Sequence, residues 1–471
     1  MNLGSLTGNG EPASVTGFAI DHRKVAPGTV FGAFRGARVN GEDFIPDAVA
    51  SGAIAVVSRP EARPEGAVHI PAGEPREAFA RLAAKFFAPF PETVIAVTGT
   101  NGKTSNVELC RQLWRMAGHP SASIGTLGVT TSDEQVTTGL TTPDIVTFLS
   151  NMAGLERMGI THAAFEASSH GLSQYRTEGL KVSAAAFTNL SRDHLDYHET
   201  MAAYFEAKMR LFEEVVEVGG TAVIWADDPK SVEVAARAQA RGLQVMTVGV
   251  EGEALKLLAR ETTQLGQKLT IAAGGKTHVV TLGLIGAYQA ANALTAAGLV
   301  IATGGDVART LANLSRVQPV RGRLERAVIS KAGAPVYVDY AHTPDAIEAA
   351  CQALRPHARE RLIIVLGAGG DRDTGKRAPM GEAAARLADK VIVTDDNPRT
   401  EDAAAIRRGI LEGAPGAEEV PGRREAIRAA IAGAGPGDIV LLAGKGHEQG
   451  QIVGDRVLPF DDVGVAREEA A

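Results

Sequence analysis

The chain has 471 residues, which is too many for one compact core, so we expect about three domains. Its net charge of -7 and its aromatic content of 5% argue against a nucleic-acid-binding surface, which needs basic residues interleaved with stacking aromatic ones. The sequence has no signal-peptide pattern and no run of about 18 apolar residues, so we expect a cytoplasmic protein without membrane insertion.

Residues 1–90 are predicted to form a small α/β domain. Strands are expected at 29–34 and 53–58, and helices at 43–51 and 75–88. A Pro-Phe-Pro segment then follows as a linker. Nothing in this stretch indicates catalysis by itself.

Residues 91–317 are predicted to form a larger domain in which strands and helices alternate. Strands are expected at 93–97, 161–166, 183–187 and 221–225. This alternation is typical of a mainly parallel sheet that is covered on both faces and binds ligands at the carboxyl ends of its strands. A hairpin over 268–282, turning at Gly274 and Gly275, and a helix over 287–303 complete the domain.

Residues 318–471 are predicted to form a second, Rossmann-like α/β domain. Its strands are expected at 336–340, 361–366, 390–394 and 438–442. Each strand is followed by a cluster of polar residues, at 339–344, 367–373, 395–399 and 444–448. Four such clusters at consecutive strand ends indicate a binding site at one edge of the sheet.

A phosphate-binding loop is predicted at residues 98–105, where an apolar β-branched run feeds a glycine turn that opens onto a helix. Lys103 supplies a cation for the terminal phosphates, and the Thr104 hydroxyl is a candidate ligand for Mg²⁺. Val97 stands where the longer P-loop pattern has glycine, so the motif is the shorter G-x-x-G-K-T. An ordinary turn between a strand and a helix is the alternative.

The polar segment at 189–198 has two interpretations. His194 and His198 lie one helical turn apart, which suggests zinc, but no complete set of four nitrogen or sulfur ligands is evident. Beside a phosphate loop, Glu166 and His194 are better explained as ligands to Mg²⁺ bound with ATP. From the sequence alone, Lys208 is expected to be a solvated lysine on a helix.

In combination, these motifs resemble the Mur ligase family of peptidoglycan synthesis, and within it the members that add diaminopimelate. The resemblance rests on residues 98–104, 168–176, 193–196, 339–345 and 396–399. It implies a three-domain ligase: 1–90 binds the uridine nucleotide substrate, 91–317 binds ATP, and 318–471 carries the incoming amino acid.

The resemblance also implies roles for individual residues. The UDP-linked substrate is assigned His22, Thr141, Thr142, Ser168, Gln174 and Arg176, with His22 standing where the family usually has serine. ATP is assigned Gly99, Thr100, Asn101, Gly102, Lys103, Thr104, Ser105, Asn292, Arg323, Asp339 and His342. Diaminopimelate is assigned Arg372, Asp396, Asn397, Pro398, Arg399, Gly444 and Glu448. The catalytic set is Lys103, Glu166, His194 and Lys208, and the Mg²⁺ set is Thr104, Glu166, His194 and Lys208, with Lys208 as a carbamate.

The expected reaction is ATP-dependent formation of an amide. ATP would phosphorylate the γ-carboxylate of UDP-N-acetylmuramoyl-L-alanyl-D-glutamate, and the amine of meso-diaminopimelate would attack the acyl phosphate. A related Mur or folylpolyglutamate-type ligase that adds another amino acid is the first alternative, and a P-loop kinase is the second. We expect the enzyme to act as a monomer.

Overall fold

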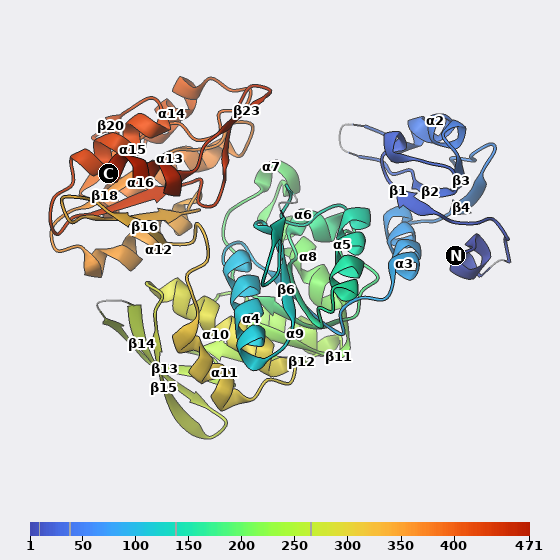
Figure 1. Cartoon of the computed structure of the whole chain (residues 1–471), viewed down its shortest axis with the longest axis horizontal. Helices are drawn as coiled ribbons and strands as arrows, with labels where there is room; N and C mark the ends of the chain where they lie inside the picture. Colours follow the sequence, from blue (N-terminus) through green and yellow to red (C-terminus); the bar gives the residue numbers. More distant parts are fainter. Residues whose placement is uncertain (9, 37–38, 137–138, 264–265) are drawn as a thin grey trace.

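Three α/β units follow one another in the computed structural model, which describes residues 1–471 except 9, 37–38, 137–138 and 264–265. Figure 1 shows the N-terminal unit at one end, the C-terminal unit at the other and the largest unit between them. The α/β class predicted from the sequence is confirmed. The domain boundaries expected after residues 90 and 317 stay a prediction.

The N-terminal unit is built on a parallel sheet in the order β1-β2-β3-β4. Helix α3 packs on this sheet through Phe79, Ala80 and Ala83, which are fully buried on one face of the helix, and the ring of Phe79 meets that of Phe18 edge-on. The elements are α1 (Leu3–Thr7), β1 (Gly17–Ala19), η1 (His22–Lys24), β2 (Thr29–Gly32), η2 (Gly41–Phe44), α2 (Ile45–Ala50), β3 (Ala53–Ser58), β4 (Val68–Pro71) and α3 (Pro75–Phe87).

The central unit has one large sheet in the order β15-β14-β13-β12-β11-β10-β5-β9-β6-β7-β8. Its strands from β13 to β6 are parallel, as expected, but antiparallel strands extend both ends of the sheet. Its first elements are β5 (Thr93–Thr98), α4 (Lys103–Ala117), β6 (Ser121–Gly125), β7 (Gly128–Thr130), β8 (Gln135–Val136), α5 (Ile145–Arg157), β9 (His162–Glu166), α6 (Ser169–Ser173), β10 (Val182–Phe187), α7 (Leu195–His198) and α8 (Met201–Arg210). A π-helical segment η3 (Leu211–Val215), β11 (Val216–Trp225), α9 (Ser231–Ala240), β12 (Gln244–Gly249), β13 (Leu255–Thr263), β14 (Gly266–Ala273), β15 (Lys276–Leu282), α10 (Ala287–Ala302), α11 (Val307–Asn313) and η4 (Leu314–Arg316) follow.

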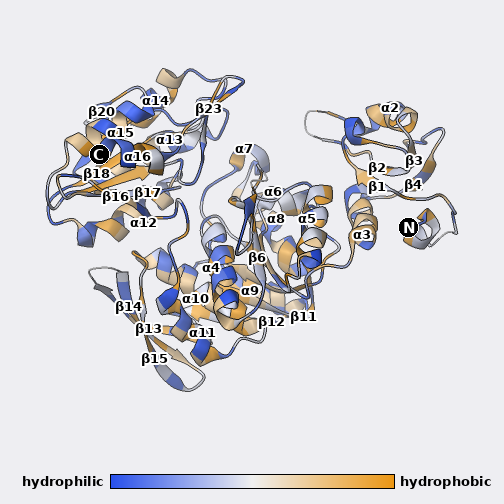
Figure 2. Ribbon diagram, in the orientation of Figure 1, coloured by the Kyte–Doolittle hydropathy of each residue, from blue (hydrophilic) through white to orange (hydrophobic). Residues whose placement is uncertain are grey.

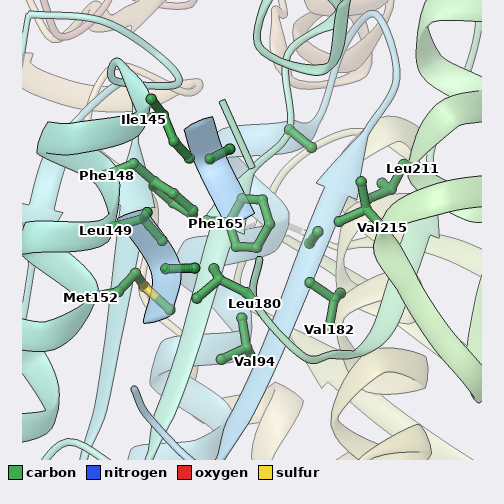
Figure 3. Close-up of a cluster of buried hydrophobic side chains, with 14 of the residues drawn as sticks. Val94, Ile145, Phe148, Leu149, Met152, Phe165, Leu180, Val182, Leu211 and Val215 are labelled. Atoms are coloured by element: carbon green, nitrogen blue, oxygen red, sulfur yellow. The ribbon is translucent and has the colours of Figure 1, made fainter. Parts of the chain in front are cut away.

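Helices cover both faces of this central sheet. Successive side chains of β5 point to opposite faces, so each face contributes to a separate core. Val94 and Ala96 belong to the core under α5, whereas Ile95 and Val97 belong to the core under α4 and α10. Figure 3 shows the first of these cores, with Phe165 of β9 among the side chains of α5. Strand β5 is thus apolar on both faces, and the phosphate loop begins where this strand ends.

The C-terminal unit has a sheet in the order β16-β17-β21-β18-β19-β20, parallel except for β16. Strand β18 is buried on both faces and stands out as apolar in Figure 2. The elements are β16 (Glu325–Ile329), β17 (Pro335–Asp339), α12 (Pro344–Leu354), η5 (Arg355–His357), β18 (Leu362–Leu366), η6 (Thr374–Lys376), α13 (Arg377–Leu387), β19 (Lys390–Val393), α14 (Ala403–Leu411), β20 (Glu418–Glu419), α15 (Arg423–Ala432), β21 (Ile439–Ala443), β22 (Gly450–Val453), β23 (Arg456–Pro459) and α16 (Asp462–Ala470). Among the described residues, no helix is long and apolar enough to cross a bilayer.

Candidate active site

The phosphate loop between β5 and α4 requires glycine at two positions. Gly99 has a φ of +144°, and a Cβ there would collide with the hydroxyl of Thr188. Gly102 has a φ of +89°, and a Cβ there would lie 2.5 Å from Oδ1 of Asn292. The glycines therefore let the loop backbone lie against its neighbours at the N-terminus of α4, the position at which helices bind phosphate.

The segment that follows β10 holds this loop in place. The backbone N–H of Thr100 donates to the carbonyl of Asn189 at 2.9 Å, and that of Asn101 donates to Oδ1 of Asn189 at 2.8 Å. The hydroxyl of Thr188 donates to the carbonyl of Asn101 at 2.6 Å. The predicted ATP-binding residues are thus fixed by two neighbouring strands rather than by the loop alone.

Two buried lysines meet at one carbonyl of the loop. Lys103 Nζ donates to the carbonyls of Gly99 and Thr100 at 2.9 and 2.7 Å, and Lys208 Nζ donates to that of Gly99 at 2.7 Å. Burial lowers the pKa of both lysines, and for Lys208 the nearby charge of Lys103 lowers the pKa further, to well below its usual range. This combination favours the neutral amine at Lys208.

The expectation of a solvated Lys208, drawn from the sequence alone, is wrong. Its side chain is only 1% exposed, and Nζ lies 4.2 Å from the ring centroid of Tyr204. The pattern of α8 misleads because the helix packs its Tyr204 and Lys208 face against the phosphate loop rather than toward water. The placement that the family resemblance implies, next to the loop, agrees with this geometry.

Glu166 ends β9 beside the loop and is buried. Its Oε1 accepts the backbone N–H of Thr126 at 2.8 Å, and its Oε2 accepts the hydroxyl of the same residue at 3.2 Å. That hydroxyl also lies 3.1 Å from the hydroxyl of Thr141, one of the residues expected to bind the UDP-linked substrate. The carboxylate is therefore held in one orientation at the junction of the two predicted subsites.

His194 and His342 approach the same carboxylate from different units. Nε2 of His194 lies 3.5 Å from Oδ2 of Asp193, and Nε2 of His342 lies 3.9 Å from that oxygen, while Lys376 Nζ is 3.8 Å from Oδ1. Burial lowers the pKa of His194 to about 3 and that of His342 to about 4, so both imidazoles are neutral at pH 7. The described residues contain no cluster of three or more His, Cys, Asp or Glu side chains arranged to hold a metal, so the zinc alternative gains no support.

A cavity of about 440 Å³ lies between the central and C-terminal units. It brings together most of the residues that the resemblance assigns to ATP: Asn101, Gly102, Ser105, Asn292, Arg323 and Asp339. Trp225, Pro229 and Tyr288 add apolar surface, which suits an aromatic base. This cavity matches the size and lining of a nucleotide site that opens onto the phosphate loop.

Arg323 joins the two units at this cavity. Its Nη2 donates to the hydroxyl of Thr104 at 2.8 Å, and its guanidinium lies 4.6 Å from the ring centroid of Tyr340. Asp339 accepts the backbone N–H of Leu324 at 2.6 Å, and burial raises its pKa to about 6. A cation from the C-terminal unit thus reaches the phosphate loop of the central unit.

A second cavity, of about 400 Å³, brings residues assigned to both other substrates to one place. From the UDP-substrate set it is lined by Thr141, Thr142, Ser168 and Arg176. From the diaminopimelate set it is lined by Arg372, Asp396, Asn397, Arg399, Gly444 and Glu448. His194 and His342 also line it, so the structure places His342 here rather than in the first cavity, which six of the residues assigned to ATP line.

Gln174 lies outside this lining but orients a residue within it. Arg176 Nη2 donates to Oε1 of Gln174 at 2.7 Å, and Nη1 donates to the carbonyl of Thr142 at 2.9 Å. Ser168 caps α6 by accepting the backbone N–H of Gly171, and its hydroxyl lies 2.9 Å from that of Thr142. The predicted UDP-substrate residues of the central unit therefore form one connected group.

Arg399 is held in an unusual backbone conformation with a φ of +52°. Its N–H donates to the carbonyl of Ile452 at 3.0 Å, and its own carbonyl accepts the N–H of Gly454 at 2.7 Å. Strand β22 therefore holds the backbone of Arg399, whereas Pro398, which was assigned to diaminopimelate, does not line the cavity.

His22 lies apart from the other residues of its predicted set, in a cavity of about 610 Å³ on the N-terminal unit. Its ring stacks on that of Phe44, with centroids 4.4 Å apart and planes 3° from parallel. Arg76 and Asp144 line the same cavity, and Asp144 comes from the central unit, two residues after Thr142. This third cavity, on the N-terminal unit, therefore extends to the part of the central unit that carries the predicted UDP-substrate residues.

Family models match three successive segments: Mur ligase family, catalytic domain, at residues 14–87; Mur ligase middle domain at 97–300; and Mur ligase, glutamate ligase domain, at 322–446. This chain belongs to the Mur ligase family. Like other Mur ligases, it is an ATP-dependent ligase.

Named relatives align along nearly the whole of this Mur ligase. It is 61% identical over 458 residues to UDP-N-acetylmuramoyl-L-alanyl-D-glutamate–2,6-diaminopimelate ligase of Zymomonas mobilis, covering 96% of this chain and 94% of the relative. The ligase of the same name from Bradyrhizobium diazoefficiens is 52% identical, with 98% and 97% covered. A solved structure of a ligase with that name superposes with a TM-score of 0.73 at 31% identity, covering 100% of this chain and 98% of the other.

The side chains at the site that were not assigned from the sequence include His170, Asp196, Tyr340 and Asp373, which line the second cavity, and three charged residues whose contacts stand out. Asp193 and Lys376 face each other between the two units, and Lys445 is fully buried beneath the cavity that holds Asn397 and Glu448. Lys445 stands between two glycines directly after a buried strand, and this position was the one available signal. Asp193 and Lys376 come into contact only because the central and C-terminal units meet, and no local sequence pattern predicts that contact.

Proposed function

We propose that this Mur ligase joins meso-diaminopimelate to the γ-carboxylate of the D-glutamate in UDP-N-acetylmuramoyl-L-alanyl-D-glutamate, at the expense of ATP. The observation that carries the proposal is the second cavity, which is lined together by residues expected to bind the two joined substrates. The relatives at 61% and 52% identity carry the name of this reaction.

The proposed reaction has two steps. A carboxylate oxygen attacks the γ-phosphorus of ATP and ADP leaves; the amine then attacks the acyl carbon, loses a proton, and phosphate leaves. Lys103 and Arg323 offset negative charge on the phosphoryl group, and both already lie at the loop. Because the site spans two units, their closure aligns the reactants and keeps water from the acyl phosphate.

The residues expected to hold Mg²⁺ fit a hard divalent cation. Glu166 offers a buried carboxylate and Thr104 a hydroxyl, which are the oxygen donors that Mg²⁺ prefers, and His194 would add a neutral imidazole nitrogen. When bound, Mg²⁺ would supply positive charge at the phosphate oxygens.

We assign the three predicted domains, 1–90, 91–317 and 318–471, to the uridine nucleotide, ATP and the amino acid respectively. His22 and its stacking partner Phe44 would lie in the uridine end of the site. We further propose that the enzyme is cytoplasmic, since ATP and nucleotide-linked precursors are substrates found in that compartment, and that it acts as a monomer.

The test is phosphate release by the purified enzyme with ATP, the UDP-linked dipeptide and a panel of amines. We expect release that depends on meso-diaminopimelate and a product whose mass has increased by the added amino acid less one water. Release without any amine, with a phosphorylated product, would identify a kinase instead. Stronger turnover with another amino acid would assign the alternative ligase.

Lys208→Ala should be nearly inactive, because Lys208 is proposed to act as a carbamate that supplies an anion beside the loop. The neutral amine favoured by burial is the form that adds CO₂, with release of one proton. Formate or acetate should restore part of the activity by replacing the missing anion.

The matched control is Lys230→Ala. Lys230 also lies over an aromatic ring, that of Phe205 at 4.8 Å, but it is half-exposed and should change turnover less than about twofold. A ¹³CO₂-labelled NMR sample of fully active enzyme that contains only unmodified lysine would rule out the carbamate.

A further inference from the structure

Lys445 is a fully buried cation under the diaminopimelate side of the second cavity. It follows β21, and its Nζ donates to three acceptors: Oδ1 of Asn397 at 3.2 Å, Oε2 of Glu448 at 3.0 Å and the carbonyl of Gly450 at 2.6 Å. An ammonium has three N–H bonds, so these contacts use all of them. Lys445 itself is not among the residues that line the cavity.

These contacts fix the side-chain amide of Asn397. Its Oδ1 accepts both Lys445 and the backbone N–H of Ile452, the latter at 2.9 Å, so the amide cannot turn over without losing two hydrogen bonds. Its Nδ2 donates to Oε2 of Glu448 at 2.8 Å. Among the contacts of the described residues, the second N–H of this amide has no acceptor, so a ligand in the cavity meets Asn397 as a donor.

The same cation fixes Glu448. Oε2 of this residue is occupied by Lys445 and Asn397, whereas its side chain is 30% exposed and lines the cavity. These two contacts leave Oε1 to accept from a ligand. Asn397 and Glu448 therefore present one donor and one acceptor beside the guanidinium of Arg399.

We propose that Lys445 is a positioning residue that presets this pocket for an amino-acid end bearing both a carboxylate and an ammonium. Asn397 and Arg399 donate to the carboxylate, and Glu448 accepts from the ammonium. The proposal rests on the proposed function, because it assigns the far end of diaminopimelate to this side of the cavity. Lys445 touches no reactant; it acts by holding the two side chains that do.

The test compares kcat/KM for three amines: meso-diaminopimelate, L-lysine, which lacks the far carboxylate, and 2-aminopimelate, which lacks the far ammonium. In Lys445→Met, selectivity against both analogues should fall together by roughly tenfold or more, because both oriented groups are released at once. The KM values for ATP and the UDP-linked dipeptide should stay within about twofold. An Arg399→Lys variant should relax selectivity against L-lysine alone.

Two further measurements keep the outcomes apart. Arg361→Met removes another cation of the same unit, one that pairs with the buried Asp438 at 2.7 Å at the amino ends of β18 and β21, and it should lower the melting temperature without changing either selectivity ratio. If Lys445→Met does not fold, Lys445→Arg decides: arginine keeps the positive charge but not the three contacts of Nζ, so selectivity against both analogues should still fall, and unchanged ratios overturn the proposal. Unchanged ratios in folded Lys445→Met also overturn it, whereas a wild-type enzyme that does not use diaminopimelate overturns the proposed function instead.

Discussion

Lys103→Met should lower kcat for ligation by roughly 10²- to 10³-fold, the usual cost of removing one group that stabilises transition-state charge. Lys103 is buried in the phosphate loop, where its ammonium lies against the carbonyls of Gly99 and Thr100. Methionine keeps most of the apolar stem of lysine, so the loop should retain its shape. Steady-state phosphate release with saturating amine measures the effect.

Lys85→Met is the control for this substitution. Lys85 also donates to a backbone carbonyl, that of Leu6 at 3.1 Å, but it lies on α3 of the N-terminal unit rather than in the loop. The Lys85→Met enzyme should release phosphate at the wild-type rate. A Lys103→Met enzyme with near-normal kcat would refute the assignment of this loop as the phosphate site.

Arg399→Ala should lose roughly 10²-fold or more in kcat/KM for meso-diaminopimelate, because a desolvated carboxylate would lose its guanidinium partner. The wild-type site should reject L-lysine strongly, since Arg399 would then be left unpaired in the closed complex. The two values should therefore converge in the variant, without L-lysine becoming a good substrate. Parallel measurements of kcat/KM for both amines test this.

Arg456→Ala provides the comparison for Arg399. Arg456 lies on the exposed strand β23 of the hairpin whose other strand contacts Arg399. Its loss should leave the ratio between the two amines unchanged. If Arg399→Ala also leaves the ratio unchanged, selectivity must come from other residues of the pocket.

Much of the strand–helix alternation could be predicted because it is a local pattern. The hairpin turning at Gly274 and Gly275 is confirmed, and the helix expected over 287–303 ends one residue earlier, at Ala302. The antiparallel additions to the central sheet at β7 and β8 were missed. These strands are very short, so the two-residue alternation that identifies a strand has little room to appear.

At the site, the sequence supplied the residue types, whereas the structure supplied their partners. The glycine loop with Lys103 could be predicted because a phosphate site is built from adjacent residues. The burial of Lys208 could not, since it depends on a loop more than a hundred positions away. Likewise, Asp193 meets Lys376 only because two separate units come together.

The pairing of β22 with the backbone of Arg399 has a consequence for how such enzymes could diverge. The backbone of Arg399 is held by hydrogen bonds to Ile452 and Gly454, which belong to a surface hairpin rather than to the cavity wall, while its Nη1 donates to the carbonyl of Gly370 at 2.8 Å. An insertion or deletion in that hairpin would re-aim Arg399 while every wall residue stayed the same. Changes in this hairpin could therefore alter the preference for the incoming amino acid without any change to the residues that bind ATP.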